Sequence, residues 1–368
     1  MLGSLAIKNY KNLKDLKIAS LGRVNLIAGK NNTGKSSLLE AVSLYASRCD
    51  LSILTQLLNE RGEYNVPFQN SLNSADSTIK TFSSLFSNRI IGFSVEDSIS
   101  VGAAANERSS SDAVSIRFVK YVYEVGTGAQ YQRKKTIIKE ELDHISDFYV
   151  GLEMRYDDIA YVLTLDDSVR SAVSNNIGVI PDKFQFIRIR DIDREINRRL
   201  WNLVTLTEKE DYVIEAVKII EPSIDRLTFI ENEWRERIAV VKLKGENVVH
   251  PLKSMGDGIN RILNIILALV NSDNGYLLID EFENGLHYSV QEKLWEIVFK
   301  LSESLNVQVF ATTHSEDCIR GFTSILNSSQ NSDKGKLIRL DNIKGVIKQT
   351  EYNALELKIA SDNNIETR

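Results

Sequence analysis

An eight-residue segment near the start of the chain has the residue types and spacing of a phosphate-binding loop. It reads Gly-Lys-Asn-Asn-Thr-Gly-Lys-Ser over residues 29–36 and matches the pattern G-x-x-x-x-G-K-[ST] throughout. The glycines let backbone N–H groups point at phosphate oxygens, Lys35 can reach the β- and γ-phosphates, and Ser36 can offer its hydroxyl to Mg²⁺. We therefore expect ATP and Mg²⁺ as cofactors. The expected nucleotide-binding residues here are Gly29, Asn31, Asn32, Thr33, Gly34, Lys35, Ser36 and Ser37.

Two adjacent carboxylates, Asp280 and Glu281, follow the apolar segment 276–279. Asp280 is placed to hold Mg²⁺ together with Ser36, either directly or through water. Glu281 can take a proton from, or orient, the water that attacks the γ-phosphate. An acidic pair at a strand end is also common on protein surfaces, but the phosphate-binding loop in the same chain favours the catalytic interpretation.

A histidine, His314, comes shortly after the next apolar strand pattern, at residues 307–311. At the end of a strand beside a nucleotide site, an imidazole can sense the γ-phosphate and stabilise charge on it. An isolated surface histidine is the alternative. The position of His314 just downstream of the carboxylate pair favours a catalytic role.

The segment 254–258, Ser-Met-Gly-Asp-Gly, opens a strongly apolar helical pattern. A helix N-terminus with small residues exposes N–H groups that attract anions, so Ser254 and Gly256 are further candidates for binding nucleotide phosphates. One nucleotide already has its own loop, so a second such terminus suggests ATP held between two protomers. An ordinary helix cap is the alternative interpretation.

The elements that must position these residues lie toward opposite ends of the chain. A buried-strand pattern at 23–28 precedes the phosphate-binding loop, and a helical pattern at 35–46 follows it. Helices and strands also alternate near the other end, at 258–270, 276–280, 288–304 and 307–311. We therefore expect an α/β fold with one core built from both termini.

The middle of the chain predicts an insertion into this core. Residues 50–115 are polar and serine-rich, a helical stretch spans 190–220, and alternating strand patterns lie at 114–125, 131–139, 148–155 and 159–165. The expected architecture is a mixed sheet with helices, an antiparallel β lobe and a helical insertion. In this view a single head spans 1–368, with its core at 1–50 and 225–340 and the insertion at 51–224.

Composition excludes several classes of protein. The 368 residues are 43% hydrophobic and 26% charged, which excludes global disorder. Two cysteines and four dispersed histidines exclude a disulfide framework and a Cys/His zinc site. A net charge of −5 excludes a uniformly basic coat for nucleic acid, although a local basic groove stays open. No membrane span or signal peptide is recognisable, so we expect a cytoplasmic protein without membrane contact.

The four candidate segments resemble those of ABC-type ATPases, in the order Walker A, signature, Walker B and switch histidine. The long separation of Lys35 from Asp280 resembles the branch that contains RecF and SMC proteins. This resemblance implies a two-lobed P-loop ATPase head, with Ser254 and Gly256 in the signature and residues 284–287 in the D-loop. It also implies a homodimer or higher oligomer that sandwiches ATP. Met255 and Asp257 depart from the usual signature, and no Q-loop glutamine can be placed among Gln130, Gln132 and Gln185.

Within that branch, the segment around 254–317 and the opening Lys-Asn-Tyr-Lys-Asn-Leu resemble the ATPase module of the OLD (overcoming lysogenisation defect) family. OLD nucleases carry a Toprim nuclease domain after the ATPase. The residues that follow Arg320 are too few for that domain, so the resemblance implies a stand-alone ATPase.

Two functions follow from this resemblance. The first is an ATP-switched dimeric sensor, the ATPase subunit of a bacterial antiphage system that controls a separate effector nuclease or toxin. The alternative is a RecF-like DNA-binding repair ATPase without an effector. A transporter ATPase fits less well because of the long insertion. DNA is a candidate partner through a basic segment at 133–135 with Lys139, whereas the arginines between 188 and 199 alternate with acids and favour a solvated, salt-bridged face.

Overall fold

The computed structural model describes residues 1–63, 74–104, 113–125, 132–136, 148–165, 181–188, 194–231, 236–328, 331–363 and 367. Lys139 and Gln130, named above, lie outside these residues, as do the side chains of 132–135 and of Asp257. None of the helices in the described part of the chain is both long and apolar enough to cross a membrane.

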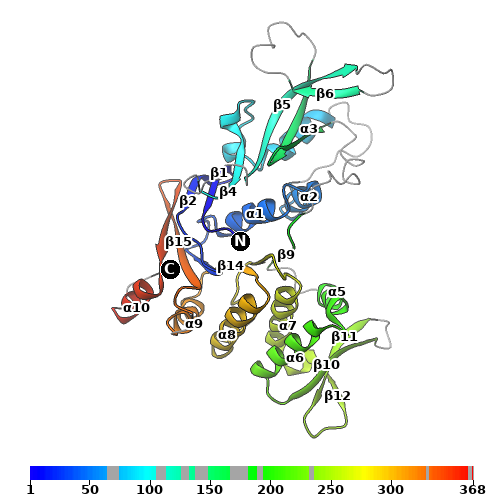
Figure 1. The fold of residues 1–368 in the computed structure, drawn as a ribbon, viewed down its shortest axis with the longest axis vertical. Coiled ribbons are helices and arrows are strands. Elements are labelled where there is room, and N and C mark those ends of the chain that lie inside the picture. The colour runs from blue at the N-terminus through cyan, green and yellow to red at the C-terminus, as the bar shows by residue number, and fades with distance from the viewer. Residues whose placement is uncertain are drawn as a thin grey trace.

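The centre of the molecule is a mainly parallel sheet of six strands within the described residues (Figure 1). Its order is β16-β15-β3-β14-β13-β9. The strands are β3 (Val24–Ala28), β9 (Phe184–Ile187), β13 (Tyr276–Ile279), β14 (Gln308–Thr313), β15 (Gly335–Ile343) and β16 (Val346–Tyr352). Only the β15–β16 hairpin is antiparallel. The phosphate-binding loop follows β3, and the acidic pair follows β13, so both leave the sheet at its carboxyl edge, where ligands of α/β sheets bind.

Helices cover the two faces of this sheet. On one face lie α7 (Asp257–Val270), α8 (Tyr288–Ser304) and α9 (Glu316–Leu326), with α10 (Ala354–Asp362) packed against α9. On the other face lies α1 (Lys35–Ala46). Alternate residues of β13 divide between the two sides: Leu277 and Ile279 join the core with α7–α9, whereas Tyr276 and Leu278 join the core with α1. This period of two is what a strand buried on both faces requires.

An antiparallel sheet packs over the α1 side and forms the lobe at one end of the molecule in Figure 1. Its order is β2-β1-β4-β5-β7-β8, with β6 paired to β5. The strands are β1 (Leu5–Tyr10), β2 (Leu13–Ile18), β4 (Ile99–Gly102), β5 (Val114–Val125), β6 (Gln132–Thr136), β7 (Tyr149–Tyr156) and β8 (Ile159–Thr164). Helices α2 (Leu51–Glu60) and α3 (Ser74–Ser83) lie between α1 and this lobe along the chain. The expected antiparallel β lobe is therefore present.

A smaller unit lies at the opposite end of the molecule in Figure 1. Helices α5 (Arg194–Val204) and α6 (Glu208–Ile220) lie within the helical stretch predicted at 190–220, and both pack against α7. Beside them is a three-stranded antiparallel sheet of β10 (Ile224–Glu231), β11 (Arg237–Leu243) and β12 (Val249–Pro251). The mixed α/β class expected from the sequence is confirmed.

Two details differ from the expected division of the chain. Strand β9 lies in the segment 51–224, assigned above to the insertion, yet it pairs in parallel with β13 in the central sheet. The polar stretch 50–115 contains α2, whose N-cap Asp50 accepts a hydrogen bond from the N–H of Ser52, and buries Leu54, Leu57 and Leu58. The domain boundaries themselves stay a prediction.

Candidate functional site

The turn between β3 and α1 has the backbone that a phosphate-binding loop needs. Gly29 (φ 146°), Asn32 (φ 66°) and Gly34 (φ 91°) have positive φ angles. Glycine adopts such angles at little cost, and asparagine tolerates the left-handed region better than most residues. A Cβ on Gly29 would lie 2.4 Å from the carbonyl oxygen of Leu340. Thr33 closes the turn by donating its hydroxyl to the carbonyl of Lys30 at 2.8 Å. The loop thus arrives at the N-terminus of α1 with its N–H groups available for an anion.

Lys35 is held by the loop that it belongs to. Its ammonium donates to the carbonyl oxygens of Gly29 at 2.7 Å and Lys30 at 2.9 Å. Burial lowers the pKa of Lys35, and the carboxylates of Asp280, Glu281 and Glu283 oppose this shift. The Lys35 side chain therefore lies within electrostatic reach of the acidic turn, across the space that the outer phosphates would occupy.

Asp280 lies at the end of β13 and is buried. One of its oxygens, Oδ1, accepts hydrogen bonds from the hydroxyl of Ser36 at 3.2 Å and from that of Thr312 at 2.6 Å. Strands β13 and β14 are adjacent, so Thr312 reaches Asp280 from the neighbouring strand. A carboxylate and a hydroxyl from opposite ends of the chain form a hard-oxygen pair, which suits Mg²⁺.

Glu281 is turned toward the same space by an unusual backbone conformation. Its φ is +49°, and its N–H donates to the hydroxyl of Thr312 at 2.9 Å. The guanidinium of Arg261, on α7, donates to the carbonyl oxygens of Asp280 at 3.0 Å and Glu281 at 3.1 Å. A non-glycine residue in this region costs free energy and persists only where surrounding contacts hold it. Thr312 and Arg261 supply those contacts.

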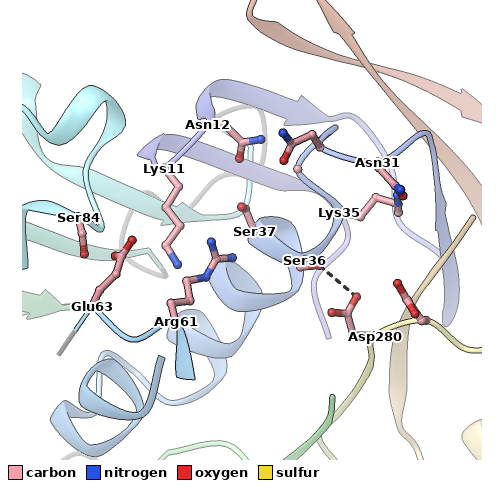
Figure 2. Close-up of a pocket in the computed structure, with 13 residues that line it drawn as sticks. Lys11, Asn12, Asn31, Lys35, Ser36, Ser37, Arg61, Glu63, Ser84 and Asp280 are labelled. Atoms are coloured by element: carbon pink, nitrogen blue, oxygen red, sulfur yellow. Dashed lines mark hydrogen bonds between the residues drawn. The ribbon is translucent and has the colours of Figure 1, made fainter. Parts of the chain in front are cut away.

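These residues line one cavity of about 550 Å³ (Figure 2). In Figure 2, Lys35, Ser36 and Asp280 are at one end of the cavity and Lys11, Arg61, Glu63 and Ser84 at the other, with Asn12 and Ser37 between them. Asn31, Asn32, Gly34 and Glu281 complete the lining. The cavity therefore brings the predicted phosphate loop and the predicted acidic pair together. It also includes residues from the β1–β2 turn and from the ends of α2 and α3 that the sequence analysis did not identify.

The newly found end is organised by Glu40 on α1. Its carboxylate accepts hydrogen bonds from Tyr10 at 3.0 Å, Lys11 at 2.6 Å and Arg61 at 2.6 Å. Burial and the Glu40 carboxylate raise the pKa of Tyr10, and burial lowers the pKa of Lys11 although Glu40 opposes it. Burial also disfavours the Arg61 cation, but Glu40 outweighs burial and raises the pKa of Arg61. Lys11 and Arg61 thus share the Glu40 carboxylate, and Glu63 adds a second carboxylate to the lining, so this end of the cavity holds two cations and two carboxylates.

The other candidates lie apart from the cavity lining. Ser254 donates its hydroxyl to the carbonyl of Pro251 at 2.7 Å and is exposed. Gly256 is also exposed; it is the N-cap residue of α7 and has a φ of 107°. A Cβ on Gly258 would lie 3.1 Å from the carbonyl of Gly285, so this segment contacts the 284–287 turn of the same chain. His314 follows β14 and contacts Glu283 rather than the cavity itself.

Two of the site's supporting residues left only weak signals in the sequence. Arg261 is 1% exposed, and a lone arginine inside the apolar pattern 258–270 could have marked a buried polar role. Thr312 lies near the end of an apolar strand, where a buried hydroxyl needs a hydrogen-bond partner and so could have marked a polar role. Lys11 and Arg61 carried no signal, because surface-type residues in a loop and at a helix end are common.

Comparisons with known proteins match most of the chain. A family model described as "AAA domain, putative AbiEii toxin, Type IV TA system" matches residues 24–317. An ATP/GTP phosphatase of Helicobacter pylori is 24% identical, with 99% of this chain and 100% of that protein covered. The DNA replication and repair protein RecF of Rickettsia prowazekii is 22% identical, with 92% and 99% covered. A solved SMC head bound to the C-winged helix domain of ScpA matches with a TM-score of 0.49 and 13% identity, covering 96% of this chain and 97% of that chain.

Proposed function

This chain belongs to the AAA-domain ATPase family whose model spans residues 24–317, and we propose that its cavity binds ATP with Mg²⁺ and hydrolyses the bond to the γ-phosphate. The ATPase class expected from the sequence is confirmed by this membership. One observation carries the proposal: Ser36, next to Lys35 of the phosphate loop, and Asp280, next to Glu281, share a hydrogen bond of 3.2 Å in a single cavity.

The residues have separate roles in this proposal. The N–H groups of 29–34 and the ammonium of Lys35 bind the β- and γ-phosphates. Ser36 and Asp280 would hold Mg²⁺, which neutralises charge on the phosphates when bound. Glu281 orients a water molecule for in-line attack and accepts its proton. Lys11 and Arg61, at the other end of the cavity, then lie toward the nucleoside.

Two substitutions separate binding from hydrolysis. Lys35→Ala removes the cation nearest the outer phosphates, so nucleotide affinity should fall by a factor on the order of 100, from the loss of a charge-assisted contact of about 3 kcal/mol. Glu281→Gln keeps the shape but cannot accept a proton, so it should bind ATP normally and hydrolyse it at least about 100-fold more slowly. Binding of a fluorescent ATP analogue and release of phosphate measure the two effects. Wild-type turnover by the glutamine variant would exclude Glu281 as the base.

We propose further that ATP assembles a homodimer in which Ser254 and Gly256 of one protomer face the nucleotide of the other. The support is their placement, since both are exposed and neither lines the cavity of its own chain. In the Glu281→Gln background, ATP should raise the mass measured by light scattering. Adding Ser254→Arg should reverse that increase without weakening nucleotide binding by the monomer. If Ser254→Arg changes neither assembly nor hydrolysis, the segment is only a helix cap.

The biological role that we propose for this switch is control of a separate effector, a nuclease or toxin, in antiphage defence by an OLD-like ATPase. The support is the family description, "AAA domain, putative AbiEii toxin, Type IV TA system". The second candidate is RecF-like DNA repair, favoured by the similarity to RecF over 92% of this chain. DNA that stimulates hydrolysis several-fold in the purified protein would favour repair. Toxicity of a neighbouring gene that depends on Lys35 would favour defence.

A further inference from the structure

Glu283 contacts His314 at two points, its backbone N–H and its ring. It lies in the turn after β13, and its side chain is only 10% exposed. Its Oε1 accepts a hydrogen bond from the backbone N–H of His314 at 3.0 Å and lies 3.1 Å from the Nδ1 of the same residue. One carboxylate oxygen therefore contacts both the backbone and the ring of a single histidine.

The backbone on both sides of His314 is also fixed. The N–H of Ser315 donates to the hydroxyl of Thr313 at 3.0 Å. The hydroxyl of Ser315 then caps α9 by accepting from the N–H of Cys318 at 3.4 Å. The main chain of this turn thus has several partners, whereas half of the His314 side chain is exposed. The contact between Nδ1 and Glu283 links the ring to the acidic turn.

The burial of part of the Glu283 carboxylate lowers the stability of the fold. Its second oxygen, Oε2, is buried and has no hydrogen-bond partner in the described part of the chain. A buried carboxylate oxygen without a donor is destabilising, so a residue of this kind calls for an explanation. Its charge also reaches the phosphate end of the cavity, where it opposes, with Asp280 and Glu281, the lowering of the Lys35 pKa by burial.

We propose that Glu283 is the positioning residue for His314 in ATP hydrolysis. By accepting from Nδ1–H, it fixes the plane of the ring and places the proton on Nδ1, so that Nε2 is the ring nitrogen directed at the γ-phosphate. A carboxylate that orients a functional histidine through Nδ1 is a recurring arrangement in enzymes. This inference rests on the proposed function, because it assigns to Glu283 an effect that passes through His314.

A double-mutant cycle tests this dependence. Glu283→Ala and His314→Ala should each lower kcat about 10-fold, the lower range for loss of an orienting partner. The double variant should be no slower than His314→Ala alone, because the two residues act as one unit. KM should stay within about twofold, since neither side chain lines the cavity. Glu283→Gln retains an acceptor oxygen and should stay within about fivefold of wild type.

The position of the proton gives a readout that needs no hydrolysis. In ¹⁵N-labelled wild-type protein, NMR should show a proton on Nδ1 of His314, with the signal assigned from the His314→Ala spectrum. In Glu283→Ala, the neutral ring should shift toward the Nε2–H form, which predominates in free histidine.

Three outcomes would overturn the inference. One is an equal loss of kcat from Glu283→Ala in the wild-type and His314→Ala backgrounds, which would mean a merely structural role. The second is an Nε2–H ring in the wild type. The third is a Glu283→Gln variant as slow as Glu283→Ala. Failure of the proposed function itself would appear elsewhere, as normal hydrolysis by Lys35→Ala.

Discussion

Glu40 offers a stringent test of how the cavity is held together. Its carboxylate is buried on α1 and accepts hydrogen bonds from Tyr10, Lys11 and Arg61, which come from β1, the turn after it and the end of α2. Glu40→Ala removes this common acceptor. The three donors then have to find water or remain unpaired, and their ability to do so differs.

The cost follows from the exposure of each donor. Tyr10 is fully buried and cannot be hydrated in place, and only 9% of the Lys11 side chain is exposed, at the wall of the cavity. The Arg61 side chain is 38% exposed and can turn toward solvent. Removing one partner of a buried ion pair costs about 3–5 kcal/mol of stability. Because Arg61 can be hydrated once Glu40 is removed, we expect a loss at the lower end of this range, about 3 kcal/mol. With a denaturant dependence of about 3 kcal/mol per molar urea, the midpoint should fall by about 1 M.

Urea unfolding monitored by circular dichroism measures this shift, with two variants for comparison. Glu246→Ala removes a carboxylate paired at 2.6 Å with His250, where both side chains are well exposed, so it should cost less than about 0.5 kcal/mol. Tyr10 and Arg61 donate to different oxygens of Glu40, so Glu40→Gln keeps an acceptor for only one of them and loses the charge. Its midpoint should fall between those of the other two variants. If Glu40→Ala moves the midpoint no further than Glu246→Ala, the cluster does not stabilise the fold.

Two further predictions concern the loop and the thiols. Gly29→Ala should weaken ATP binding at least about 10-fold and lower stability by about 1–3 kcal/mol, because of the strained φ and the clash at 2.4 Å. The control Gly62→Ala, at φ 68° with open space around it, should leave affinity unchanged. Isothermal titration with an ATP analogue compares the two variants, and equal affinities would refute the role of Gly29. Burial raises the pKa of Cys49 and of Cys318, so neither thiol should react with Ellman's reagent at pH 8 in the native protein. Both should react in guanidinium chloride. A thiol that reacts fast in the native state would contradict the packing around it.

The chemistry of the phosphate end could be predicted from the sequence because its parts are local. A strand, a glycine turn and a helix N-terminus follow one another within residues 24–46, so backbone preferences alone bring Lys35 and Ser36 to the loop. The acidic pair is also local, since Asp280 and Glu281 stand where a buried strand ends. Pairing these two segments in one site relied only on their co-occurrence in the chain.

The other end of the cavity was decided by tertiary structure. The order β3-β14-β13 places Thr312 between the loop strand and the acidic strand, and no periodicity in the sequence encodes that order. Lys11 and Arg61 come together only because Glu40, on the side of α1, faces the antiparallel lobe and the end of α2. Such contacts depend on how distant segments pack, so local propensity says nothing about them. The sequence alone therefore determined the candidate phosphate loop and the acidic pair, and the packing of the lobe against α1 determined which side chains surround the rest of the cavity.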